Sequence, residues 1–125
     1  MGLRVTKGEG MTRVVAEGEF SRDEIEETFS RIREDHSSLS PLRILIHDEG
    51  SHFDPGLPEV RGLVRVWAEI FDGMTVRIAL LVARDAHFGI GRQLSVFTDE
   101  SPVILSVFRD RPQALAWLES SAPAA

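Results

Sequence analysis

The sequence VRIALLV at residues 76–82 is almost continuously apolar, and LRILI at residues 42–46 has the same composition. One arginine interrupts each run, Arg77 in the first and Arg43 in the second. Runs of this kind are typical of strands inside a parallel sheet, where helices cover both faces. We therefore expect the two runs to be neighbouring parallel strands whose carboxyl ends meet at one edge of the sheet.

Helical and strand patterns alternate on either side of these two runs. Between them, apolar residues from Val60 to Phe71 keep helical spacing, and Asp72-Gly73 ends the helix. Upstream, two short apolar runs joined by Gly8-Glu9-Gly10 predict a hairpin. The next segment predicts a helix, because Ser21 and Glu24 have the spacing of a capping box.

The C-terminal half continues the alternation. A third helix is predicted from about residue 85 to 98, a fifth strand over Val103–Phe108, and a last helix that Asp110 caps. The expected fold is a single α/β domain over residues 1–119, with a flexible tail over 120–125. Its single-layer sheet is mixed, mostly parallel and five-stranded, and four helices flank it.

Composition narrows the classes of function. The chain has 125 residues, no cysteine and a net charge of −6, so disulfides and thiol chemistry are excluded and a general nucleic-acid binder is disfavoured. The first ten residues lack the apolar segment of a signal peptide, and the longest apolar run is far shorter than a membrane helix. We expect a cytoplasmic protein that is not embedded in a membrane.

The C-terminal third carries a family resemblance. The segments AHFGIGRQLSVF (86–97) and VFRDRPQALAWLES (107–120) resemble the SpoIIAA-like branch of the STAS superfamily, also described as STAS/Sec14-like. The resemblance implies a mixed sheet with one antiparallel strand, and a binding or regulatory module. Members that are anti-sigma-factor antagonists carry a phosphorylatable serine where this chain has Pro55, and Ser51 lies upstream of that position. The familiar phosphorylation switch is therefore in doubt here.

Ligands of such sheets gather at the carboxyl ends of the parallel strands. The residues that follow the two central strands are therefore the candidate ligand- or partner-binding residues: Asp48, Ser51, His52, Phe53, Asp54, Arg84, Asp85, His87 and Phe88. Carboxylates outnumber arginine in these loops, which favours a cationic or neutral partner over a phosphate.

Metal and catalytic interpretations are weaker. His47, His52 and His87 are possible metal ligands, but their spacing matches no known motif, so neither a metal nor another cofactor is expected. Ser51 with a histidine and an aspartate has the residue types of a hydrolase triad, but the G-x-S-x-G elbow is missing. We therefore expect no enzymatic activity.

Two functions stay open. The first is a non-enzymatic, STAS-like regulatory or protein-binding module. The alternative is binding of a small apolar or amphipathic, lipid-like molecule in a cleft at the carboxyl ends of the parallel strands. Phe53, Phe88 and Trp67 would line that cleft, unless they only fill the core. A homodimer is possible through an exposed patch that includes Phe53 or Leu57.

Overall fold

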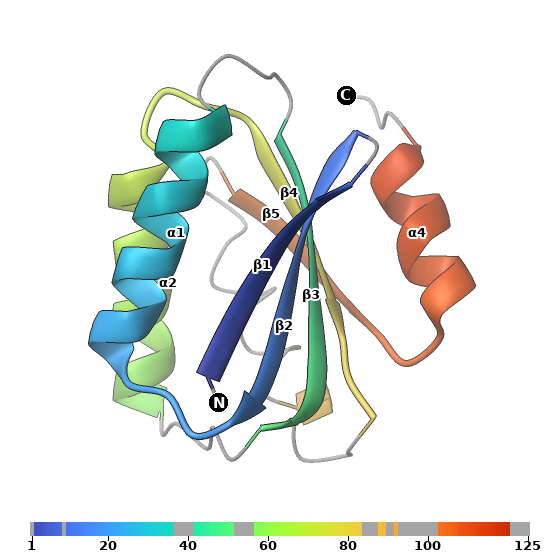
Figure 1. Cartoon of the computed structure of the whole chain (residues 1–125), viewed down its shortest axis with the longest axis horizontal. Coiled ribbons are helices and arrows are strands. Elements are labelled where there is room, and N and C mark those ends of the chain that lie inside the picture. Colours follow the sequence, from blue (N-terminus) through green and yellow to red (C-terminus); the bar gives the residue numbers. More distant parts are fainter. Residues whose placement is uncertain are drawn as a thin grey trace.

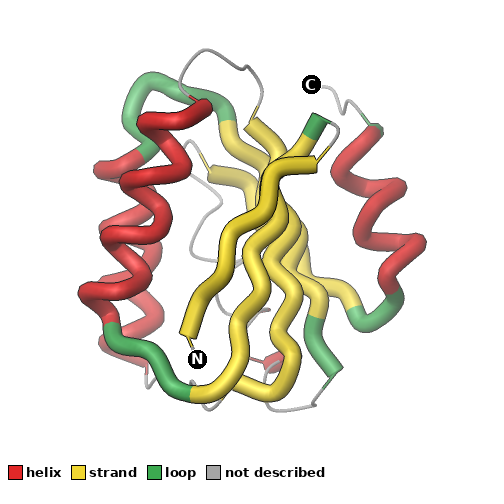
Figure 2. The backbone as a smooth tube through the Cα atoms, viewed as in Figure 1, coloured by secondary structure: helices red, strands yellow, loops and turns green. Residues whose placement is uncertain are grey.

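The computed structural model describes residues 2–8, 10–36, 42–51, 57–83, 88–89, 92 and 103–120. One sheet lies between α1 and α2 on one side and α4 on the other (Figures 1 and 2). Its strands stand in the order of the sequence: β1 (Gly2–Gly8), β2 (Met11–Gly18), β3 (Leu42–Ser51), β4 (Val76–Leu81) and β5 (Val103–Phe108). The helices are α1 (Arg22–His36), α2 (Leu57–Ile70) and α4 (Arg111–Glu119).

Strands β3 and β4 lie side by side and parallel, with Leu42 opposite Val76 and His47 opposite Leu81. This confirms the central prediction from the sequence. β2 is parallel to β3 and β4 to β5, whereas β1 pairs antiparallel with β2 through the predicted hairpin. The carboxyl ends of β2 to β5 therefore meet at one edge of the sheet, which we call the carboxyl edge.

The predicted third helix falls mostly outside the described residues. Phe88, Gly89 and Arg92 are helical, and nothing else of residues 84–102 is described. The described part of the chain thus has three complete helices, and the fourth stays a prediction. Of the expected tail only Ser120 is described, and it caps the end of α4. None of the described helices is long and apolar enough to cross a membrane.

Side chains alternate between the two faces of β3, as the pleat of a strand requires. Leu42, Ile44 and Ile46 belong to the larger core cluster under α1 and α2, which also holds Phe29, Trp67 and Phe71. Leu45 belongs to the smaller cluster under α4, together with Ala79, Leu81, Ala114 and Leu118. Because both faces are covered, the central strands are apolar at nearly every position.

The two arginines of the central strands point toward α4. Arg43 Nε donates to the Leu118 carbonyl at 2.8 Å, and Arg77 Nη2 donates to the Trp117 carbonyl at 2.8 Å. Arg43 and Arg77 are opposite each other in the register of β3 and β4. Burial lowers the pKa of the Arg77 guanidinium, and the charge of Arg43 lowers it further.

The predicted cap of α1 forms only in part. Ser21 Oγ accepts from the Glu24 backbone N–H at 3.1 Å, as a capping box requires. The Glu24 carboxylate, however, accepts from the backbone N–H of Leu3 in β1 at 3.1 Å. The first turn of α1 lies beside the edge strand, so this carboxylate joins two elements instead of closing its own helix end.

Candidate functional site

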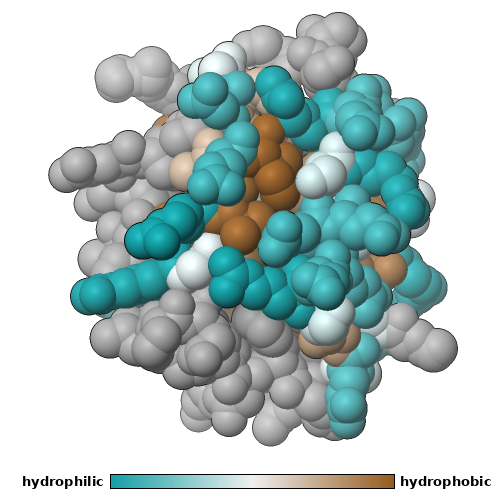
Figure 3. Space-filling view, turned by 90° about the vertical axis from the view of Figure 1, so that its left-hand side faces the viewer, coloured by the Kyte–Doolittle hydropathy of each residue, from teal (hydrophilic) through white to brown (hydrophobic). Residues whose placement is uncertain are grey.

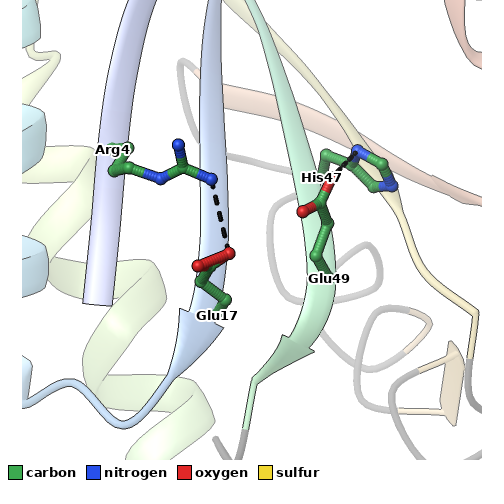
Figure 4. Close-up of polar contacts among 4 residues, drawn as sticks. All are labelled: Arg4, Glu17, His47 and Glu49. Atoms are coloured by element: carbon green, nitrogen blue, oxygen red, sulfur yellow. Dashed lines mark hydrogen bonds and ion pairs between the residues drawn. The ribbon is translucent and has the colours of Figure 1, made fainter. Parts of the chain in front are cut away.

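At the carboxyl edge, the last side chains of β3 alternate between the two faces of the sheet. His47 and Glu49 point to the α4 side, where His47 Nδ1 lies 3.3 Å from Glu49 Oε2 (Figure 4). Asp48 alternates to the α1–α2 side and is 9% exposed. Among the predicted site residues, Asp48 is therefore placed in the layer under α1 and α2, away from the surface beside α4.

An open pocket of about 210 Å³ lies at the carboxyl edge on the α4 side. Its apolar part comes from the end of β4, where Leu81 and Val82 are buried. Polar side chains from β3, from the end of β5 and from the start of α4 complete it. The described lining residues are His47, Leu81, Val82, Ala83, Arg109 and Arg111.

The two arginines of this pocket differ in their surroundings. Arg109 Nη2 donates to the Ala83 carbonyl at 3.0 Å, and its guanidinium lies 5.6 Å from the centroid of the Phe88 ring. Arg109 thus ties the end of β5 to the end of β4. Arg111 is the exposed first residue of α4, and its guanidinium has no hydrogen bond or ion pair with another described residue.

Two described carboxylates on the α4 side of this edge already have partners. Asp110 Oδ2 accepts from the Gln113 backbone N–H at 3.1 Å, which caps α4 as predicted. Glu49 lies against His47. Asp48 faces the other way, so the α4 side of this edge carries fewer carboxylates than the loop composition indicated.

Most of the remaining predicted site residues cannot be placed. Ser51 ends β3 opposite Gly18 of β2, and its side chain is not described. Phe88 contacts Arg109, beside the pocket. The other predicted residues lie outside the described part of the chain: His52, Phe53, Asp54, Arg84, Asp85 and His87.

The structure also bears on the metal and cleft alternatives. No group of three or more histidine, aspartate or glutamate side chains placed to hold a metal ion occurs within the described ranges. His52 and His87 are outside those ranges, so the metal interpretation is not tested. Trp67 is 3% exposed and packs edge-on against Phe29, with ring centroids 5.5 Å apart. It fills the core and does not line the pocket.

Reasoning from the sequence missed Arg109 and Arg111. It followed the loops after the two central strands and left out the end of the fifth strand. The signal was present in Phe108-Arg109-Asp110-Arg111, where two arginines flank a helix cap directly after an apolar strand. Since β5 is parallel to β4, the end of β5 must share the same edge.

The outer face of α1 and α2 is different in character. Figure 3 shows a largely hydrophilic surface there, with apolar side chains visible in a limited area near its centre. On α1, Arg22 pairs with Glu26 and Arg31 with Glu27 one helical turn apart. This face is a solvated helical layer.

Comparison with solved structures identifies the fold as SpoIIAA-like. One similar solved structure is that of an uncharacterized protein from the DUF3478 family with a SpoIIAA-like fold, from Shewanella loihica PV-4. The TM-score is 0.59, the identity is 15%, and the match covers 94% of this chain and 92% of that one. No family model and no curated protein matches the chain. The fold expected from the resemblance is thus confirmed.

Proposed function

We propose that this protein is a non-enzymatic, STAS-like regulatory module that binds a protein partner at its carboxyl edge. The pocket there would receive a pair of side chains from the partner, one apolar and one carboxylate. The observation that carries the proposal is the combination of apolar Leu81 and Val82 with the exposed guanidinium of Arg111 in one open pocket.

The size of the pocket favours a side chain over a whole small molecule. Pockets that enclose drug-sized ligands usually measure ~300–1,000 Å³. The pocket at the carboxyl edge, at about 210 Å³ and open to solvent, is smaller. An apolar side chain would enter the pocket beside Leu81 and Val82, and a neighbouring carboxylate would reach Arg111 and form a charge-assisted hydrogen bond.

The charge of the partner follows from the same residues. The predicted loops contain more carboxylates than arginines, which favoured a cationic or neutral partner. At the pocket itself, Asp110 and Glu49 are already engaged. A partner that brings a carboxylate therefore finds the guanidinium of Arg111 at the rim without displacing either of these side chains.

The test compares two charge reversals. A partner recovered from the source cell is purified, and its Kd is measured against the unmodified protein, Arg111→Glu and Arg65→Glu. Arg65 is exposed on α2, so it is a matched control on the other side of the sheet. Arg111→Glu places an acidic residue in the first turn of α4, which a helix tolerates well. We expect Arg111→Glu to raise the Kd at least tenfold and Arg65→Glu to leave it within twofold.

A partner that binds Arg111→Glu as tightly as the unmodified protein would contradict the proposal. The alternative of a small amphipathic acid has support in the same apolar wall and cationic rim. Its probe is octanoate, with octanol as the uncharged control. Saturable amide shifts at residues 81–83 and at Arg111 with octanoate alone would favour this alternative over a protein partner.

A further inference from the structure

Helix α4 leaves part of its face of the sheet open. It packs on β3, β4 and β5, and no described helix packs on β1 and β2 from that side. Figure 1 shows α4 to the right of the sheet, and β1 and β2 are the strands nearest the viewer. On this side the hairpin β1–β2 presents Arg4, Thr6, Arg13, Val15 and Glu17, which we call the hairpin face.

The dimensions of the hairpin face suit one helix. Neighbouring strands are ~4.8 Å apart, so two strands span about 10 Å, which is the diameter of an α-helix. Strand β2 has 8 residues. At ~3.4 Å per residue its length is about 27 Å, and an α-helix of about 18 residues covers that distance.

The chemistry of the hairpin face is cationic with apolar contact points. Val15 is half-buried in the middle of it, and Met11 is half-buried where the face meets the cluster under α4. Arg4 pairs with Glu17 at 3.3 Å (Figure 4), which leaves the charge of Arg13 unmatched on the face. Arg13 Nε is buried and lacks a hydrogen-bond partner in the described structure.

The geometry points to the hairpin face as a docking surface for an acidic amphipathic helix of a partner protein, lying beside α4. Apolar residues of that helix cover Val15 and Met11, and its carboxylates reach Arg13. The chain as a whole has a net charge of −6, so most of its surface disfavours an acidic helix. A cationic face of this kind therefore directs such a helix to one position on the molecule. The inference extends protein binding to a second surface, and its test uses variants outside the pocket.

A second copy of this chain fits the hairpin face less well. The unmatched charge of the face is that of Arg13, and two copies related by a two-fold axis would bring Arg13 of each copy toward the same face of the other. Like charges at such an interface are unfavourable. A helix with carboxylates on both sides of an apolar stripe has the complementary arrangement.

The probe is a peptide of about 18 residues with capped ends, a leucine stripe and flanking glutamates. Its counterpart has lysine at every glutamate. We expect the acidic peptide to bind saturably, with amide shifts concentrated on β1 and β2. Arg13→Glu and Thr6→Glu should each raise its Kd at least fivefold, and Arg65→Glu should not. Thr6 is exposed, so Thr6→Glu keeps the test valid if Arg13→Glu unfolds the chain.

Four results would overturn the inference. The first is no binding of the acidic peptide, or equal binding of the lysine peptide. The second is a set of shifts confined to the pocket or to α1 and α2. The third is a dimer in sedimentation that Thr6→Glu dissociates, because a second copy would then occupy the face. Loss of peptide binding in Arg111→Glu but not in Thr6→Glu would likewise assign the peptide to the pocket.

Discussion

The guanidinium of Arg77 lies 4.2 Å from the centroid of the Trp117 ring and donates to the carbonyl of the same residue at 2.8 Å. One arginine of β4 thus binds both the side chain and the backbone of the last turn of α4. That turn has no basic residue of its own to offset the partial negative charge of the helix end. Arg77, with Arg43 opposite it, supplies this charge from the sheet.

Replacing Arg77 should therefore loosen α4. Arg77→Ala removes a charged hydrogen bond, a cation–π contact and buried side-chain packing, which together contribute about 2–3 kcal/mol to the free energy of unfolding. Relief of the repulsion by Arg43 offsets a small part of this loss. Urea unfolding measures the difference. Arg65→Ala, at an exposed position, serves as the control and should change stability by less than about 0.5 kcal/mol. An equal effect of both variants would refute the assignment.

Arg43 and Arg77, which are opposite each other in the register, also show what could not be predicted from the sequence. The apolar runs around Arg43 and Arg77 predicted two interior strands, because burial on both faces leaves little room for alternation. The register that sets the two arginines opposite each other follows from how the whole sheet aligns, and no local pattern encodes it. The side chains of both arginines were consequently left without a role.

The bond between Glu24 and β1 gives a second prediction. Glu24→Ala removes the acceptor of the Leu3 backbone N–H, and we expect a loss of about 1 kcal/mol in the free energy of unfolding. Glu24→Gln retains an oxygen acceptor and should recover most of that loss. Glu26→Ala removes a carboxylate from an exposed pair on the same helix and should have little effect. Identical stability of the alanine and glutamine variants would show that the bond to Leu3 contributes nothing.

The cap of α4 is a third point of attachment. Asp110→Ala leaves the Gln113 backbone N–H without its acceptor and should lower the free energy of unfolding by about 1 kcal/mol, within the range of 0.5–2 kcal/mol for such caps. Asp110→Ser keeps a capping oxygen and should be nearly as stable as the original. Thermal unfolding of the three proteins distinguishes these outcomes. A serine variant as unstable as the alanine variant would mean that Asp110 acts through something other than the cap.

The carboxyl edge was located correctly from the two central strands, but its accessible residues were not. Alternation along β3 alone would place His47 and Asp48 on opposite faces. Which of these faces stays open depends on where α4 packs, and α4 is more than sixty residues away in the sequence. Arg109 and Arg111 were missed for the same reason, since their contribution depends on β5 lying next to β4.

The last prediction separates the two arginines of the pocket. Arg109 ties β5 to β4 through the Ala83 carbonyl, next to the point where the Val82 backbone N–H donates to the Phe108 carbonyl at 2.9 Å. Without Arg109, the hydrogen bonds between the ends of β4 and β5 should break more often. We expect Arg109→Ala to speed hydrogen exchange at the Val82 amide about tenfold, equivalent to about 1.4 kcal/mol of local opening. Arg111→Ala should leave that rate unchanged, because its guanidinium makes no such bond to the described strands. Equal exchange in the two variants would mean that Arg109 does not hold the pocket wall, and that the pocket keeps its shape through β4 and β5 alone.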